Sequence, residues 1–264
     1  MKKYFEMAKI LFKVQIAYRF DVAMTALATV GRVLFAWILW GAVFSGRERV
    51  GGFTYQTMLA YYLASSFLTS LDMSAGLSSE IAERIRNGTF SKFMVIPAGT
   101  QRCFMSQNFG AALYYAVFSL LAAAACAVIF RVEFVFSGNL TRMAAALLME
   151  ILGLVFMASY QYFIGILAFK FQDIGFFLHV QGSLLAFATG TMAPLSLLPP
   201  GVTGILRRLP FYYVTYLPAM LLTGQNGGEA LPGLITIAAW TTGMLLVSRA
   251  AYRHLRVHYD GVGI

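Results

Sequence analysis

The sequence predicts an all-α protein that crosses a membrane with six helices. Of its 264 residues, 59% are hydrophobic and only 12% are charged, whereas a soluble domain carries about 25% charged residues. Apolar runs of about 20 residues, the length that spans a bilayer as a helix, recur along the chain. Aromatic residues make up 15% of the sequence, which suits a protein with Trp and Tyr at the membrane interfaces. We therefore expect a single transmembrane domain over residues 1–264.

The chain begins with a predicted amphipathic helix over residues 3–20. Lys2, Glu6, Lys9 and Lys13 recur at helical spacing and mark its polar face. The opposite face is apolar and contains Tyr4, Phe5, Ala8, Leu11, Phe12 and Ile16. A basic helix of this kind lies in the plane of the membrane interface. Binding of a calmodulin-like partner is the alternative, but a spanning segment follows directly.

Six segments are predicted to span the membrane, which places both chain ends on the same side. They are residues 22–44, 53–75, 104–130, 140–169, 174–198 and 230–250. Thirteen of the 20 Lys and Arg residues lie in the N-terminal arm, the 76–103 loop, the C-terminal tail and at Lys170, against six on the opposite side. Because basic residues favour the cytoplasmic side, both termini are expected in the cytoplasm. The basic residues form no single patch, so nucleic-acid binding is not expected.

The segment 194–232 is predicted to enter the membrane from the outer side and turn back. It contains six of the seven prolines, and proline interrupts helical hydrogen bonding. Residues 209–222 are nevertheless apolar and aromatic. A re-entrant or interfacial helical hairpin over 205–224 fits both facts. A seventh span is the alternative, and it would place the C-terminal basic residues outside.

The largest cytoplasmic loop contains a predicted short amphipathic helix within residues 76–90. Ser79 suits the N-cap, and Gly88 suits the position after the helix end. Ile81 and Ile85 share one face. The remaining positions are mostly charged and include Glu80, Glu83, Arg84 and Arg86. Such a helix either projects from the membrane or caps the bundle at the interface.

No motif for enzymatic chemistry is found. A P-loop needs Gly before Lys, and none of the six lysines follows a glycine. The chain is therefore not expected to hydrolyse ATP by a P-loop. His254 and His258 lie four residues apart, but only Asp260 could complete a ligand set, so no metal site is expected.

Two charges lie inside predicted spans, Arg32 in the first and Glu150 in the fourth. A charge at the centre of a span costs about 2.5–3.5 kcal/mol on the insertion scale. Such groups normally face the protein interior and find a partner. We therefore expect Arg32 and Glu150 to form an intramembrane pair that fixes helix packing. A proton or substrate relay is the alternative.

Together these features resemble the permease subunits of ABC-2 type exporters, in the bacterial branch of about this length. The segments that carry the resemblance are Tyr18-Arg19-Phe20-Asp21, Trp40, residues 52–62, residues 80–97 and the proline-aromatic segment. Residues 80–97 are similar to the branch's cytoplasmic loop, acidic-Ile-x-x-Gly-x-x-x-x-x-Leu-x-x-Pro. Met94 or Val95 stands here in place of the usual leucine. The resemblance covers the whole chain.

The resemblance implies that the helix after the second span couples to a separate ATPase subunit. Ile81 and Ile85 would be apolar anchors in a groove of that subunit, and the turn at Phe171 would make a second contact. The implied coupling residues are Glu80, Ile81, Glu83, Arg84, Ile85, Arg86, Asn87, Gly88, Gln172 and Asp173. ATP and Mg²⁺ would bind two copies of the ATPase, with no cofactor on this chain. A second permease subunit, identical or related, would complete the pathway in the bacterial inner membrane, and residues 205–224 would form an external gate.

The solute is expected to be hydrophobic or amphipathic. Aromatic residues that would line its path are Tyr61, Tyr62, Phe67, Phe187 and Phe211. Packing of the same residues against lipid or one another is the alternative. A non-ABC secondary carrier or a membrane-embedded enzyme is the competing interpretation of the whole chain. A Walker-motif ATPase encoded beside it would favour the exporter.

Overall fold

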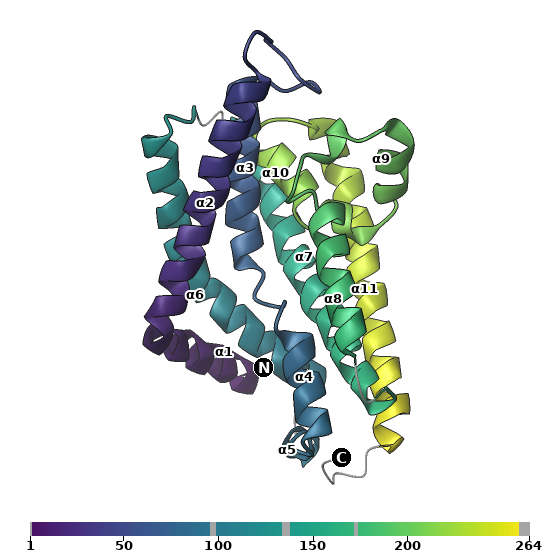
Figure 1. The fold of residues 1–264 in the computed structure, drawn as a ribbon. Coiled ribbons are helices and arrows are strands. Elements are labelled where there is room, and N and C mark those ends of the chain that lie inside the picture. Colours follow the sequence, from purple (N-terminus) through teal and green to yellow (C-terminus); the bar gives the residue numbers. More distant parts are fainter. Residues whose placement is uncertain (1, 96–98, 134–137, 172–173, 259–264) are drawn as a thin grey trace.

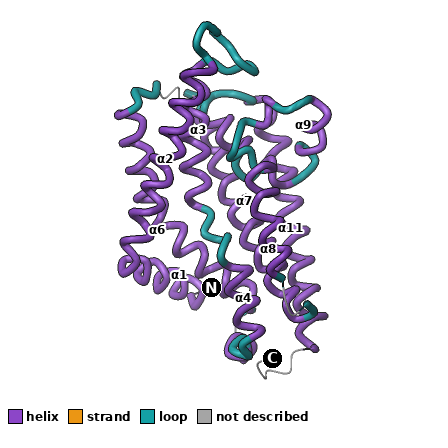
Figure 2. The backbone as a smooth tube through the Cα atoms, in the orientation of Figure 1, coloured by secondary structure: helices purple, strands orange, loops and turns teal. Residues whose placement is uncertain are grey.

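The computed structural model describes residues 2–95, 99–133, 138–171 and 174–258. Over these ranges the chain is helical and contains no strand, as Figure 2 shows. The helices of the first half are α1 (Lys2–Gln15), α2 (Arg19–Val43), α3 (Tyr55–Leu71), α4 (Leu77–Arg86), α5 (Ser91–Val95) and α6 (Thr100–Ile129). Those of the second half are α7 (Leu140–Ile166), α8 (Gly175–Ala188), α9 (Pro200–Leu206), α10 (Tyr216–Leu222) and α11 (Ala230–Leu255).

Helix α1 lies across one end of the bundle, transverse to α2 (Figure 1). It packs on α6, where Gly110 faces the backbone of Ala8 so closely that a Cβ would overlap it. The ring of Phe12 meets Tyr114 edge to face at 5.4 Å. Other apolar side chains, including Phe5 and Ile10, remain exposed. The predicted amphipathic helix therefore forms, with one part of its apolar surface packed on α6.

Within the described ranges, four helical stretches are long and apolar enough to cross a membrane. They are Phe20–Val43, Thr100–Ile129, Leu140–Phe169 and Gly227–Leu255. They correspond to the predicted segments 22–44, 104–130, 140–169 and 230–250. Helix α7 packs against α4, α6, α10 and α11. The C-terminal part of α11 lies at the same end of the molecule as α1, α4 and α5 (Figure 1).

The other two predicted spans are shorter than expected, so the count of six is not confirmed. Helix α3 has 17 residues and ends where the Asp72 carboxylate accepts a hydrogen bond from the Ser74 backbone N–H at 2.9 Å. This local turn competes with helical bonding. Helix α8 has 14 residues, about 21 Å of helix, against a hydrocarbon core of about 30 Å. It ends before Gly190, whose φ of +74° continues no right-handed helix.

Residues 189–229 form short helices that fold back into the bundle. Helix α10 is buried from Tyr216 to Leu221 and packs against α7 and α3. Tyr61 of α3 donates to the Gly190 carbonyl at 2.7 Å, and Tyr62 donates to the Met192 carbonyl at 2.9 Å. Irregular backbone is tolerated at membrane depth only where protein groups satisfy it. These contacts fit a re-entrant segment.

Candidate functional site

Helices α4 and α5 form a compact unit at the end of the molecule where α1 and the end of α11 also lie (Figure 1). The N-cap of α4 is Gly76, three residues before the predicted N-cap Ser79. No side chain caps the helix. Its other end is as predicted: Asn87 is the C-cap and Gly88 takes a φ of +71°. A glycine is favoured there because L side chains rarely adopt positive φ.

The apolar face of α4 is buried in the protein itself. Ile81 is fully buried and Ile85 is buried beside it. They belong to a cluster with Leu77, Phe90, Phe104, Tyr162, Ile166 and Phe169. Gly165 allows α7 to approach α4 closely, since a Cβ on this residue would lie only 2.8 Å from the Ile81 Cβ. In this structure Ile81 and Ile85 therefore fix α4 on α7, and their implied role as anchors in a partner's groove stays a prediction.

The polar residues of α4 divide into two groups. Arg84 forms an ion pair with Glu80 at 2.7 Å and lies over the Phe93 ring at 5.2 Å, which joins α4 to α5. Glu83 and Arg86 are exposed and form no ion pair within the described residues. We call Glu80, Glu83, Arg86 and Asn87, all exposed, the coupling face.

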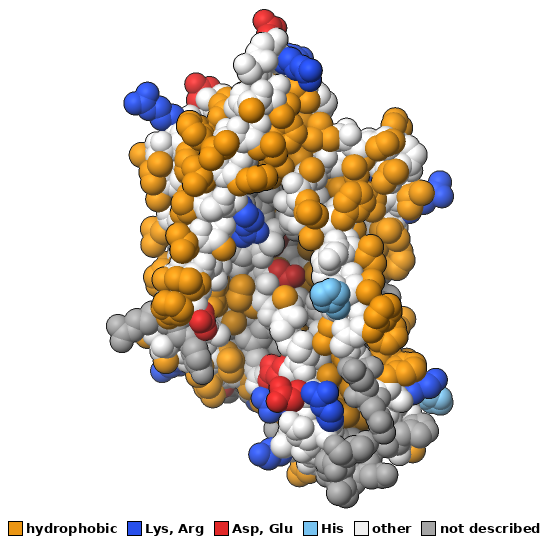
Figure 3. All heavy atoms as spheres, in the orientation of Figure 1, with side chains coloured by type: hydrophobic (Ala, Val, Ile, Leu, Met, Phe, Trp, Pro, Cys, Tyr) orange, Lys and Arg blue, Asp and Glu red, His pale blue; other side chains and the backbone are white. Residues whose placement is uncertain are grey.

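On the face drawn in Figure 3, acidic and basic side chains lie at this end and at the opposite end, and hydrophobic side chains cover much of the surface between them. The second predicted contact, Gln172 and Asp173, lies outside the described residues.

Arg32 and Glu150 do not form the predicted pair. Neither belongs to an ion pair, and both Arg32 Nε and Glu150 Oε2 are buried without a hydrogen-bond partner among the described residues. Glu150 is 5% exposed. Its electrostatic interaction is with the carboxyl group of Asp72, not with the Arg32 guanidinium. Similar depth in two spans did not place the two side chains on facing surfaces.

The five aromatic residues expected to line a path are separated by the structure. Tyr61 and Tyr62 are buried in the core and hydrogen-bonded, and Phe67 packs against the same core. Phe187 and Phe211 instead line a cavity of about 450 Å³ between α8, α7 and the segment after α9. Sequence reasoning did not identify the other walls of this cavity: Tyr160, Ile164, Phe176, Phe177, Val180, Gln181, Leu184, Leu185, Ala188, Leu206 and Leu209. The mostly apolar composition of α8, with Phe176, Phe177 and Phe187 among aliphatic residues, was the signal available. The cavity can accommodate an apolar molecule or a lipid chain.

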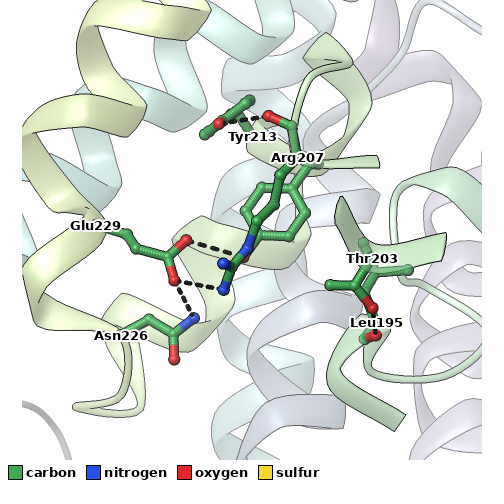
Figure 4. Close-up of polar contacts among 7 residues, drawn as sticks. Leu195, Thr203, Arg207, Tyr213, Asn226 and Glu229 are labelled. Carbon is green, nitrogen blue, oxygen red and sulfur yellow. Dashed lines mark hydrogen bonds and ion pairs between the residues drawn. The ribbon is translucent and has the colours of Figure 1, made fainter. Parts of the chain in front are cut away.

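A polar cluster fastens the outer segment to the start of α11, and Figure 4 shows it. The Glu229 carboxylate accepts hydrogen bonds from Arg207 at 2.8 Å, Tyr212 at 3.0 Å and Asn226 at 3.2 Å. A hydrogen bond with the Tyr212 side chain raises the pKa of the Arg207 guanidinium, so this cation stays charged. Tyr213 donates to the Arg207 carbonyl at 2.7 Å. Sequence reasoning located this segment but not its contact with α11.

The comparison with protein families identifies the chain. The model of the ABC-2 family transporter protein matches residues 30–263. A comparison with curated proteins gives no match. The matched range contains α3 to α11 and most of α2, and α1 precedes it. Since this range is most of the sequence and its helices are those of a multi-pass membrane protein, the chain belongs to the ABC-2 family of transporter proteins.

Proposed function

We propose that the chain is the permease subunit of an ABC exporter that moves a hydrophobic or amphipathic solute out of the cell. ATP and Mg²⁺ would bind a separate ATPase subunit, which docks on the coupling face. Membership of the ABC-2 family supports a membrane transport role. The observation that carries the coupling proposal is that α4 exposes charged residues at one end of the molecule while its apolar face is fixed on α7.

Helix α7 connects the coupling face to the outer segment. Near one end, Gly165 contacts Ile81 of α4. Gly153, twelve residues earlier, lies against Val214, with only 3.2 Å between an added Cβ and the Val214 Cα. These two contacts are about 18 Å apart along the helix. A movement of α4 driven by the ATPase would therefore displace α7 and reach residues 205–224, which act as the external gate.

The proposed assembly contains two permease subunits, identical or related, and two ATPases. The coupling face and both termini lie in the cytoplasm, on the side favoured by the basic residues. The solute enters from the bilayer or the cytoplasm and contacts the cavity lined by Phe187 and Phe211, whose walls are almost entirely apolar. Apolar walls of this kind favour apolar ligands, because a polar group placed against them loses water without gaining a partner.

The test is charge reversal on the coupling face. The chain is co-expressed with the Walker-motif ATPase encoded beside it and captured by a tag on the permease. The double variant Glu83→Arg/Arg86→Glu should reduce recovered ATPase tenfold or more, since like charges placed against each other cost several kcal/mol. The matched control is Glu48→Arg/Arg49→Glu, exposed residues in the loop after α2, which should leave recovery unchanged.

Two results would overturn the proposal. Equal ATPase recovery in both double variants would remove the coupling face from the interface. Efflux of a hydrophobic fluorescent dye from vesicles that contain the permease alone, at the rate of the full complex, would indicate a secondary carrier instead. Under the proposal, dye efflux requires the ATPase and ATP, and it falls with ATPase recovery in the Glu83→Arg/Arg86→Glu variant.

A further inference from the structure

We propose that a cavity between the start of α6 and the end of α11 binds a phosphate group, carried by the headgroup of an anionic lipid. The cavity has a volume of about 520 Å³. Its walls include Arg102 from α6, Arg249 and Arg253 from α11, and Arg256 directly after α11. We call this site the arginine cavity.

The four arginines supply positive charge that no acidic side chain among the described residues neutralises. None of them forms an ion pair with a carboxylate of the described chain, and no Asp or Glu lines the cavity. Arg249 and Arg253 are four residues apart, so they share one face of α11, and Arg256 is the C-cap directly after the helix. The guanidinium of Arg256 lies over the Tyr252 ring at 5.7 Å, which fixes its position at the cavity wall.

Gln101 provides independent evidence for a ligand that accepts hydrogen bonds. This side chain lines the cavity and is only 8% exposed. Its amide Nε2 is buried and has no hydrogen-bond partner among the described residues. A buried donor without a partner is unfavourable. A turn of the Gln101 amide toward the cavity would let an anion there accept a hydrogen bond from this donor.

The start of α6 adds further donors to the same wall. Gly99 is the N-cap, and no side chain caps the helix. The N–H groups of the first turn, at Thr100, Gln101 and Arg102, therefore point out of the helix end, where the helix dipole also favours negative charge. Arginine forks and helix-start N–H groups are the donors that bind phosphate oxygens.

The position of the arginine cavity favours a lipid as the source of the phosphate. Leu246 and Val247 are exposed directly before Arg249 on α11, so exposed apolar surface adjoins the arginines. Headgroups lie at this boundary, and basic pockets between transmembrane helices bind anionic headgroups. At the outer segment, by contrast, Arg207 is neutralised by Glu229.

The test measures lipid retention by native mass spectrometry. The purified chain in detergent is mixed with dioleoyl-phosphatidylglycerol or with dioleoyl-phosphatidylcholine. The wild-type chain should retain phosphatidylglycerol in preference to phosphatidylcholine. Arg249→Gln/Arg253→Gln should weaken phosphatidylglycerol binding about 25-fold, from about fivefold for each arginine near the surface. Arg249→Lys/Arg253→Lys should keep most of it, and Arg47→Gln/Arg49→Gln in the loop after α2 should not change it.

A second variant makes the test independent of the double substitution. Gln101→Glu is nearly isosteric but places a carboxylate in the cavity, so it should abolish the preference for phosphatidylglycerol while thermal unfolding in phosphatidylcholine stays unchanged. Equal phosphatidylglycerol retention by wild type, Arg249→Gln/Arg253→Gln and Gln101→Glu would overturn the proposal. If sodium phosphate stabilises the wild-type chain as much as phosphatidylglycerol does, the site takes a soluble phosphate and the lipid assignment is overturned.

Discussion

The contact between α4 and α7 can be tested by adding one methyl group. In Gly165→Ala the new Cβ would lie 2.8 Å from the Ile81 Cβ, 3.0 Å from its Cγ2 and 3.1 Å from the Ser78 Cα. Two of these atoms belong to rigid parts of α4, so the helix itself must move. Inserting a methyl group into a packed contact costs about 1–3 kcal/mol.

The matched control is Gly243→Ala in α11, where an added Cβ meets nothing within 4 Å. Both substitutions gain about 1 kcal/mol of helix propensity, so the difference between them isolates the clash. For a chain of this size, about 1 kcal/mol shifts the melting temperature by about 2–4 °C. Gly165→Ala should therefore melt about 2–12 °C below Gly243→Ala when intrinsic fluorescence is followed in detergent. Equal melting temperatures would refute the packing of α4 on α7 and the coupling route through α7.

Three further substitutions test the packing of α1, the core and the outer segment. Gly110→Ala should lift α1 from α6 and expose Cys103, now buried beneath it, to maleimide labelling; unchanged labelling would contradict this. Tyr61→Phe removes a buried hydrogen-bond donor to a loop carbonyl and should destabilise the chain by about 1–3 kcal/mol in thermal unfolding, whereas wild-type stability would exclude that contact. Glu229→Gln weakens three hydrogen bonds and should speed trypsin cleavage after Arg207, with equal cleavage rates counting against the cluster.

The long helices were predictable because their determinants are local. A run of about 20 or more mostly apolar residues specifies a helix wherever it lies, and the predicted starts and ends of α7 agree closely with the structure. The shortening of α3 and α8 was not predictable from hydropathy. Asp72 ends α3 through its hydrogen bond to Ser74, and a left-handed Gly190 follows the end of α8, although both positions lie in runs that remain apolar.

In the candidate sites, too, local features were predictable and contacts between distant residues were not. The sequence placed Ile81 and Ile85 on one face of a short helix, and that was right. Periodicity cannot say what an apolar face packs against, and the glycine at 165 that accepts it is 84 positions away from Ile81 in the chain. Whether Arg32 and Glu150 face each other was likewise not predictable, because depth along a span does not fix the direction in which a side chain points.

The sequence by itself determined that this chain is a helical membrane protein and where the four long helices of the described residues lie. It also determined that residues 76–90 contain a short amphipathic helix and that residues 205–224 form an apolar segment interrupted by proline. Each of these follows from composition, periodicity or proline content within a short window. Only the tertiary structure decided that α4 is fixed on α7, that Glu229 holds Arg207, and that four arginines at the start of α6 and the end of α11 share one cavity. Those contacts join residues far apart in the chain, and packing of whole helices, not local propensity, brings them together.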